Sequence, residues 1–398
     1  MLFQEEQDEM KIYVLSNSSL IKDLVTGGDI VLPQTAKCWR NKYEIHLVCG
    51  VIGKGIWQDF GPKVKTHVLK ENFLEKTEWL PLGPLKYVVR AFQTTVIIDK
   101  VLKKEEGKIV IITPSDYFVD VIPAFWARMR FKNARWLARA YHIIESPLKR
   151  KGNFLANTFS FLAQRIGLFL IKGKADLVVP LGGTYKDLVA MNFDKNKLKI
   201  SNAGVDMKAL RRTKPIRKKF EAIEIGMLTV TRGVYDLLDI WKLVVEKMPK
   251  AKLAIVGGGA GEVVREYKEK IFTMGLKKNI HYFGYLPKNE EVYAVLKASK
   301  IHLCPLHENG WSLPVAEAMS VGIPTVAYER KMFGTAFKKG YITAPTHDKK
   351  RFAQVVVELL KDETKLRKLS QDALEESKYF DWQYIAGDLL NEIEKLGK

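Results

Sequence analysis

The chain has 398 residues, 47% of them hydrophobic, so it is long enough to bury two sizeable cores in two or three domains. Its three cysteines, Cys38, Cys49 and Cys304, are an odd set without metal-ligand spacing. That pattern excludes a disulfide framework and predicts small buried thiols in a reducing compartment. The formal net charge is +20, and residues 101–250 hold 29 Lys and Arg against 14 acidic residues. Such an excess indicates an anionic substrate, an anionic membrane surface or nucleic acid, unless it is solvated surface.

The amino-terminal segment predicts a doubly wound α/β domain. Residues 1–9 are mostly polar and acidic, the reverse of a secretion signal, so we expect a disordered tail on a cytoplasmic protein. Met10–Ser16 and Tyr43–Cys49 are apolar runs of strand length, and between them lie Gly27–Gly28 and a helix-like run. Strand, glycine pair, helix and strand open such a domain, although a glycine pair alone indicates only a turn.

The next segment continues this plan with more aromatic and basic residues. Lys108–Thr113 and Asp176–Pro180 are again apolar runs of strand length, and Thr184–Asn192 reads as a helix. Tyr117–Arg130 mixes aromatic residues with arginines, and Trp136–Ile144 contains His142. A histidine after a strand is either a polar strand-end residue or part of a site at that edge of the sheet.

Asn153–Lys172, NFLANTFSFLAQRIGLFLIK, is the most lipid-like segment. It is too short and too polar for a transmembrane span, and Arg165 interrupts it. The pattern predicts either a core-facing helix or a helix lying on a membrane. Basic residues flank it and favour a peripheral site on an anionic membrane: Lys149, Arg150, Lys151, Lys172, Lys174 and the tract 128–139. The predicted apolar stripe consists of Leu155, Phe159, Leu162, Ile166, Phe169 and Leu170.

A hinge is predicted at 197–220, where the extended run Leu198–Asp206 meets a basic tract. The strand–loop–helix plan then repeats from Glu224–Leu228. Ala251–Gly261 is a strand that ends in glycines, and Ile280–Leu286 is a further strand. A glycine-rich loop of this kind is weak evidence for dinucleotide binding by itself.

The stretch from Ile301 to Tyr328 reads as strand, loop, helix and strand. Pro314 suits the first helical position, and Pro314–Val321 forms a short helix that Gly322 closes. The loop places free backbone N–H groups at the carboxyl edge of the sheet, where open α/β sheets bind ligands. An anionic or hydroxyl-rich ligand would suit this place, and Glu317 could accept hydrogen bonds from its hydroxyls.

The same stretch resembles the signature segment of retaining nucleotide-sugar glycosyltransferases of the GT-B type, family 4. Trp311 stands where the family has Phe, and Ser312 where it has Gly. The first of the family's two glutamates is replaced by Asn309, with Glu308 one place earlier. The residues that match in register are Pro305, Gly310, Leu313, Pro314, Glu317, Ala318 and Met319.

A second match lies at the start of the carboxyl-terminal half. The family's pattern there contains two cations that clamp the leaving diphosphate. Gly226, Leu228, Arg232 and Gly233 match, but Met227 occupies the position of the usual arginine. Because arginine stays charged and binds phosphate in a bidentate manner, Arg232 could act alone or with another cation that the pattern does not place.

The resemblance implies an α/β protein of the GT-B fold, in which two Rossmann-like doubly wound domains face each other across a cleft. Residues 1–200 would bind the acceptor, residues 201–378 would bind the nucleotide sugar, and 379–398 would form a helix that crosses back to the first domain. It implies His142, Arg232 and Asn309 as catalytic residues and no metal. The implied donor-binding residues are Gly27, Gly28, Gly226, Gly233, Gly284, Tyr285, Leu286, Glu308, Gly310, Trp311, Ser312, Leu313 and Glu317.

The activity implied is the retaining transfer of a sugar, a hexose, from a nucleotide-diphosphate sugar to a hydroxyl acceptor. The acceptor would be a lipid-linked or membrane-proximal glycan, the nucleotide sugar a co-substrate, and no cofactor is expected. Met227 and Asn309 leave open a catalytically degenerate subunit that binds nucleotide sugar. A sugar epimerase of the same fold is a further alternative. A nucleic-acid-binding protein is disfavoured, because the chain resembles no recognition helix, zinc finger or aromatic RNA platform.

Overall fold

The computed structural model describes residues 10–19, 27–71, 74, 83–150, 153–307 and 311–397, and it divides into two compact units. The first unit comprises residues 1–203 and 383–398, and the second comprises residues 204–382. The predicted boundaries after residues 200 and 378 lie three and four residues before these divisions. The tail predicted at 1–9 lies outside the described residues.

The first unit is built on a parallel six-stranded sheet in the order β3-β2-β1-β4-β5-β6. Its strands are β1 Lys11–Ser16, β2 Glu44–Cys49, β3 Lys65–Val68, β4 Ile109–Thr113, β5 Ala134–Ala140 and β6 Leu177–Pro180. Its helices are α1 Gly27–Trp39, α2 Val51–Phe60, α4 Gly83–Leu102, α5 Phe118–Arg130, α6 Phe154–Lys174, α7 Gly182–Ala190 and α15 Trp382–Gly397, with 3₁₀ turns η2 Pro147–Lys149 and η3 Lys195–Lys197.

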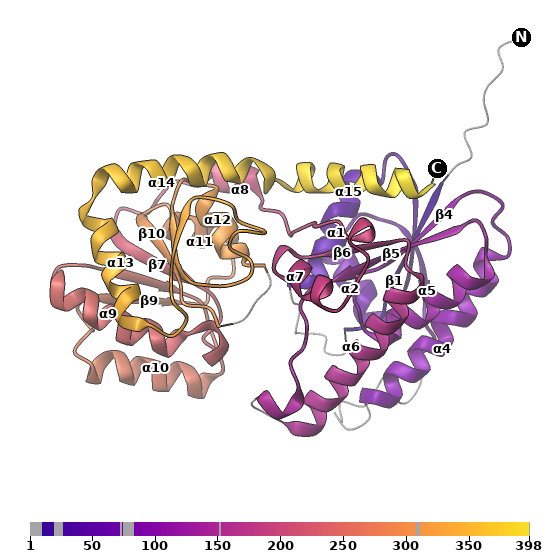
Figure 1. Ribbon diagram of the computed structural model, residues 1–398, viewed down its shortest axis with the longest axis horizontal. Helices are drawn as coiled ribbons and strands as arrows, with labels where there is room; N and C mark the ends of the chain where they lie inside the picture. The colour runs from indigo at the N-terminus through magenta and orange to yellow at the C-terminus, as the bar shows by residue number, and fades with distance from the viewer. Residues whose placement is uncertain are drawn as a thin grey trace, which may run out of the picture. The chain divides into compact units, whose positions relative to one another are not determined.

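Helices cover both faces of this sheet, which explains why its strands read as continuous apolar runs. Along β1, Tyr13 and Leu15 point to the face covered by α4, α5 and α6. Ile12 and Val14 point to the opposite face, which is covered by α1, α2 and α15. In Figure 1 the three helices α4, α5 and α6 run side by side on the first of these faces.

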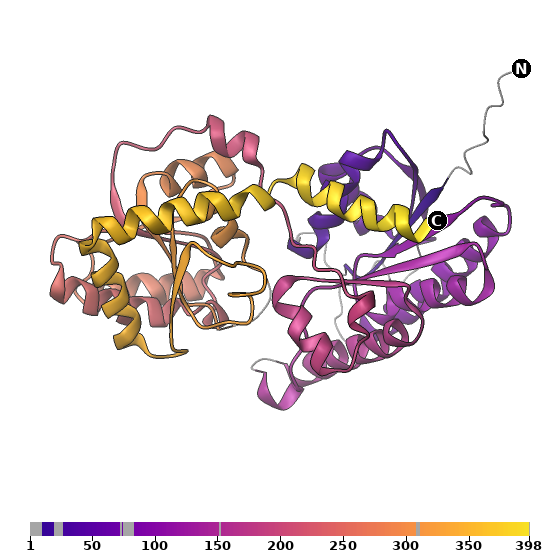
Figure 2. The same cartoon turned by 45° about the horizontal axis from the view of Figure 1, so that its top comes forward.

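The helix α15 belongs to the core of the first unit although it comes last in the chain. Ala386, Leu389 and Ile393 are fully buried in the same cluster as Trp39. The indole Nε1 of Trp39 donates a hydrogen bond to the Ala386 carbonyl over 2.8 Å. This helix is the yellow segment in Figures 1 and 2.

The second unit repeats the architecture with the sheet order β12-β11-β10-β7-β8-β9, again parallel. Its strands are β7 Phe220–Ile225, β8 Leu253–Val256, β9 Ile280–Gly284, β10 Ser299–Cys304, β11 Thr325–Tyr328 and β12 Tyr341–Ala344. Its helices are α8 Met207–Arg212, α9 Val234–Lys247, α10 Gly261–Thr273, α11 Asn289–Leu296, α12 Leu313–Met319, α13 Lys349–Lys361 and α14 Glu363–Glu376, with 3₁₀ turns η4 Val230–Arg232 and η5 Ser377–Tyr379. The prediction of two Rossmann-like, doubly wound domains is confirmed.

The extended run Leu198–Asp206 pairs with the first sheet only at an isolated bridge: Lys199 and Ser201 donate backbone hydrogen bonds to β6, and the chain then leaves the sheet. One local prediction was wrong. Cys38 is exposed rather than buried, because it lies on the outward side of α1, whereas Cys49 and Cys304 are buried.

Candidate functional site

The strand order of the second unit reverses between β7 and β10, so the loops after these two strands meet at one edge of the sheet. The His307 backbone N–H donates to the Thr231 carbonyl over 2.8 Å. Gly233 has a φ of 70°, and a Cβ added there would lie 1.9 Å from the Pro305 carbonyl oxygen. Only glycine fits this contact, which places Arg232 directly beside the loop that follows β10.

Glycines also make room for the Arg232 side chain. A Cβ at Gly226 would lie 2.5 Å from the Arg232 Nη1, so the guanidinium lies against the backbone that follows β7. Gly257, at φ 149°, approaches so closely that its Cβ would lie 1.7 Å from the Gly226 carbonyl oxygen. The sequence-predicted Gly226, Arg232 and Gly233 are therefore brought together.

Glu224 is a buried acid that interacts electrostatically with Arg232 but does not neutralise it. Glu224, in β7, is buried, and burial raises the pKa of its carboxyl to about 8 although the Arg232 charge lowers it. Within the described part of the chain, its Oε2 atom has no hydrogen-bond partner. Glu224 is therefore largely protonated at neutral pH, and the positive charge of Arg232 remains available to an anion.

A second arginine at this edge was not predicted. Arg330 follows β11, and its Nε donates to the Leu306 carbonyl over 2.6 Å. Its Nη2 is buried without a partner among the described residues. Both Arg232 and Arg330 interact electrostatically with Cys304, at the carboxyl end of β10. The only sequence signal was its place directly after a predicted strand; by contrast, Met227 is 59% exposed and carries no charge.

The helix after the β10 loop is α12, seven residues long and slightly shorter than predicted. Its Glu317 is buried and accepts a hydrogen bond from the Tyr293 hydroxyl over 3.1 Å. Burial raises the pKa of Glu317 to about 7, so near neutral pH the carboxyl exchanges between charged and protonated forms. Tyr293 fixes the direction of this side chain from the neighbouring α11.

The residues just before α12 are held by aromatic packing. The ring of Trp311 stacks on Phe337 with centroids 4.5 Å apart. Ser312 is buried at the first turn of the helix, and Leu313 is half-buried. The predicted residues Glu308, Asn309 and Gly310 lie outside the described residues.

The predicted base-binding segment follows β9 at the same edge. Gly284 has a φ of 75°, and its carbonyl accepts a hydrogen bond from the Gly257 N–H over 2.8 Å. Tyr285 is 74% exposed, while Leu286 packs against the core. The exposed tyrosine ring therefore stands beside the glycine loop after β8, where a planar base could stack.

Predicted residues of the first unit also share one edge of their own sheet. Gly27 and Gly28 begin α1, and the Gly28 carbonyl accepts a hydrogen bond from the Tyr141 hydroxyl over 3.0 Å. His142 follows Tyr141, and its carbonyl accepts from the Gln164 Nε2 over 2.6 Å. Gly28 is thus tied to Tyr141, after β5, and His142 is tied to α6 through Gln164.

Asp236, His307 and His347 have ligand atoms within 4.8 Å of one another. The Lys349 ammonium lies 3.1 Å from the Asp236 carboxylate, and the Tyr328 hydroxyl donates to it over 3.0 Å. The His307 Nε2 lies 3.0 Å from the Asp236 Oδ2, and although burial raises the pKa of Asp236, this hydrogen bond and the contacts with Lys349 and Tyr328 hold it well below its ordinary value. With a lysine already paired to the carboxylate, the cluster is an ion-pair network that fastens His307 to α9.

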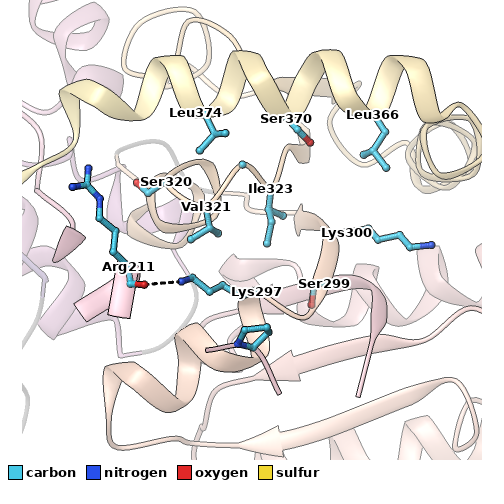
Figure 3. Close-up of a pocket in the computed structure, with 12 residues that line it drawn as sticks. Arg211, Lys297, Ser299, Lys300, Ser320, Val321, Ile323, Leu366, Ser370 and Leu374 are labelled. Carbon is cyan, nitrogen blue, oxygen red and sulfur yellow. Dashed lines mark hydrogen bonds between the residues drawn. The ribbon is translucent and has the colours of Figure 1, made fainter. Parts of the chain in front are cut away.

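A hollow of about 650 Å³ lies elsewhere in the second unit (Figure 3). It is lined by Ser299, at the start of β10, and by Ser320 and Gly322, just after α12. The Lys297 ammonium there donates to the Arg211 carbonyl over 3.5 Å. Because Ser299 and Cys304 are opposite ends of one strand, this hollow is not part of the Arg232 site.

Comparison with known proteins agrees with this geometry. Residues 206–376 match the model of the family "Glycosyl transferases group 1". The second unit is a group 1 glycosyltransferase domain. An uncharacterized glycosyltransferase of Methanocaldococcus jannaschii is 25% identical over 373 residues, covering 82% of this chain and 88% of that protein. The similarity to that protein therefore extends over both units.

Two further likenesses bear on this glycosyltransferase. The poly(glycerol-phosphate) alpha-glucosyltransferase of Bacillus subtilis is 29% identical over 175 residues, which is 42% of this chain and 25% of that protein. The crystal structure of HepE from Anabaena in complex with UDP has a TM-score of 0.72 at 16% identity and covers 97% of this chain and 100% of its own. At that identity the likeness shows the fold alone, which is GT-B.

Proposed function

We propose that this glycosyltransferase moves a hexose from a nucleotide-diphosphate sugar to an acceptor hydroxyl, with retention of the anomeric configuration. The observation that carries the proposal is the unneutralised guanidinium of Arg232 at the β7–β10 reversal, held beside the loop after β10 by glycines that let the backbone segments pack closely. The HepE structure with UDP, which shares the fold, supports a uridine diphosphate as the first donor to test.

The chemistry asked of the site is stabilisation of a leaving diphosphate. The bond from the anomeric carbon to the β-phosphate oxygen breaks, and a bond to the acceptor oxygen forms on the same face of the sugar. The acceptor proton passes to the departing phosphate oxygen. Negative charge grows on the diphosphate during this step, so fixed cations lower the barrier. We assign that work to Arg232 and Arg330, without a metal or another cofactor.

The remaining predicted residues take their roles within this proposal. Glu317 would accept a hydrogen bond from the donor's hydroxyls, and Gly284, Tyr285 and Leu286 would hold its base. His142 and Asn309 would face the sugar, as the family resemblance implies. The acceptor would be a lipid-linked or membrane-proximal glycan at the cytoplasmic face of a membrane.

A donor screen followed by product analysis tests the proposal. UDP, GDP and ADP, each with its sugars, are added to the full chain, and the melting temperature is measured in the presence of a chelator. We expect one diphosphate to raise it, because a ligand that binds only the folded state stabilises that state. NMR of the transferred sugar should then show the donor's anomeric configuration; inversion, or a requirement for added metal, would contradict the proposal.

Met227 favours a second candidate, a subunit that binds nucleotide sugar without transfer, because an uncharged residue occupies one clamp position. Binding in the thermal screen with neither donor hydrolysis nor transfer would select it.

A further inference from the structure

Three neighbouring helices of the first unit, α4, α5 and α6, carry large apolar side chains on their outward sides. On α4 they are Leu85, Val88, Phe92 and Val96, spaced so that they share one side of the helix. On α5 they are Ile122, Trp126 and Met129, and on α6 they are Phe154, Leu155, Leu162, Ile166 and Phe169. Phe92 is 69% exposed, and Leu155 and Phe169 are each 77% exposed. We call these twelve residues, with Leu148 of η2, the apolar face.

The inward sides of the same helices already form the core. Ile98, Val121 and Leu168 are buried against the sheet. A Cβ at Gly167 would lie 1.9 Å from the Asp116 carbonyl oxygen, so α6 is pressed against the backbone that follows β4. The apolar face is therefore a second apolar side that folding leaves uncovered. Exposed apolar patches of this extent mark a surface that another phase or molecule covers.

Figures 1 and 2 show α4, α5 and α6 adjacent in both views, and α5 contacts both α4 and α6. Among the described residues, α6 is the helix long and apolar enough to cross a membrane by length and composition. Its packing through Gly167 and Leu168 holds it on the unit, so it lies along the surface and does not leave the fold to span.

The positive charge near the apolar face indicates what kind of partner would cover it. Residues 128–174 contain eleven Lys and Arg but a single acid, Glu145. A second copy of the chain packed face to face would bring these cations against one another, which is unfavourable. An anionic lipid surface offers both an apolar interior for the side chains and negative headgroups for the cations. The cations whose side chains the structure describes are Arg128, Arg130, Lys132, Arg135, Arg139, Arg150, Arg165, Lys172 and Lys174.

The details of the cations agree with a lipid boundary. Arg139 is buried, Arg128 is paired with Asp176, and Arg130 is paired with Asp99 over 2.6 Å, so these three are engaged by the protein. Arg130 lies over the exposed ring of Trp126, with its guanidinium carbon 5.9 Å from the ring centroid. Tryptophan and basic residues side by side are typical of the headgroup region of a bilayer.

We propose that the apolar face docks the glycosyltransferase on an anionic bilayer, with α4, α5 and α6 lying in the interface and the surrounding cations on the headgroups. This deepens the proposed function, because an enzyme held there would meet a lipid-linked acceptor in the plane of the membrane. Docking itself requires neither donor nor turnover, so it can be tested separately.

The test is co-sedimentation of the full chain with vesicles of phosphatidylcholine, with or without phosphatidylglycerol. We expect binding to the mixed vesicles at least about tenfold stronger than to phosphatidylcholine alone, and weaker as salt rises. The variant Phe92→Ser/Leu155→Ser/Phe169→Ser should lose about tenfold or more of that binding. The matched control is Phe272→Ser, which removes a 67% exposed phenylalanine from α10 in the second unit and should leave binding unchanged.

The change in melting temperature on adding nucleoside diphosphates distinguishes a loss of vesicle binding from a loss of folding. The triple variant should respond to the diphosphate as the unsubstituted chain does, which shows that it is folded. Equal vesicle binding by both chains overturns the docking proposal. A dimer that the triple substitution dissolves, without vesicle binding, overturns it in favour of a second copy. Vesicle binding that requires the apolar face, with no transfer to any acceptor, leaves docking standing and removes the proposed function.

Discussion

The two units share a strand order but use it differently. In the second unit the unusual residues lie in loops at the ends of strands: Gly226, Arg232 and Gly233 after β7, and Arg330 after β11. In the first unit the most unusual feature is the outward side of α4, α5 and α6, which lies away from the strand ends. Under the two proposals above, one doubly wound scaffold places its chemistry on its loops and its attachment to a membrane on its helices, independently.

The largest expected effect comes from removing the charge of Arg232, which tests whether the loops of the second unit carry the proposed chemistry. Arg232→Ala should lower kcat by about 100-fold or more and change KM less, because a clamp on the leaving diphosphate acts mainly in the transition state. Steady-state kinetics with the donor found in the thermal screen measure it. Arg265→Ala, on α10 with its side chain 78% exposed, is the control. An unchanged kcat would remove Arg232 from the mechanism.

Gly233→Ala tests whether the close contact between Gly233 and the Pro305 carbonyl requires a residue without a side chain. The substitution combines a left-handed residue, worth roughly 1–2 kcal/mol, with an overlap on the Pro305 carbonyl that adds roughly 1–3 kcal/mol. Urea unfolding should show both. Gly275→Ala has nearly the same φ, 74°, but open space around it, so it should show only the first. Equal losses in the two variants would mean that the Pro305 contact is not made.

Glu224 gives a pH test of the buried acid behind Arg232. The folded carboxyl has a pKa of about 8, above the ordinary 4.5, so the folded state holds a proton that the unfolded state releases. The free energy of unfolding should therefore fall as the pH rises from about 5 to 8, by roughly 1 kcal/mol per unit from this group. Glu224→Gln should lose that slope in urea unfolding. Parallel curves for both proteins would show that Glu224 is ionised.

A smaller effect is expected at the second arginine. Arg330→Met keeps the length of the side chain and removes its charge, so donor kcat/KM should fall by about tenfold, as for one charge-assisted hydrogen bond. Arg330→Lys should recover part of the loss. If the methionine variant reacts as the unsubstituted chain does, Arg232 meets the diphosphate without this partner.

The smallest change in stability is expected on the outward side of α6 in the first unit, where it can be compared with a change on the buried side. Phe169→Ser, on a side chain that is 77% exposed, should change the free energy of unfolding in solution by about 0.5 kcal/mol or less. Leu168→Ser, one residue away and buried, should cost several times more. Similar losses at both positions would mean that the outward side of α6 is covered in solution.

Sequence reasoning reached the parts of the fold that depend on local pattern. The strands of both sheets are continuous apolar runs because both faces are buried, and glycines mark the loops at their ends. The helix α4 was not predicted, because its apolar residues lie on two sides of the helix. The sequence therefore lacks the alternation of apolar and polar residues by which an amphipathic helix is recognised. The helix α5 escaped because Pro123 lies inside it, where packing against the sheet keeps the helix intact.

The site divides in the same way. Arg232 and Glu317 belong to spaced motifs, so the resemblance to the family named them as candidates from the sequence. Arg330 belongs to no motif, so the sequence did not name it. Its side chain is oriented by the Leu306 carbonyl, and it comes close to Cys304 only because β10 pairs with β11. The protonation of Glu224 likewise depends on burial, which the sequence does not record.

The position of α15 carries a consequence for synthesis of the chain on the ribosome. Ala386, Leu389 and Ile393 complete a core whose other members, among them Trp39, are translated before the entire second unit. The second unit can thus acquire its structure while the first unit still lacks the helix that covers one part of its core. Nascent chains halted before residue 383 should therefore resist protease in residues 204–382 but not around α1 and α2.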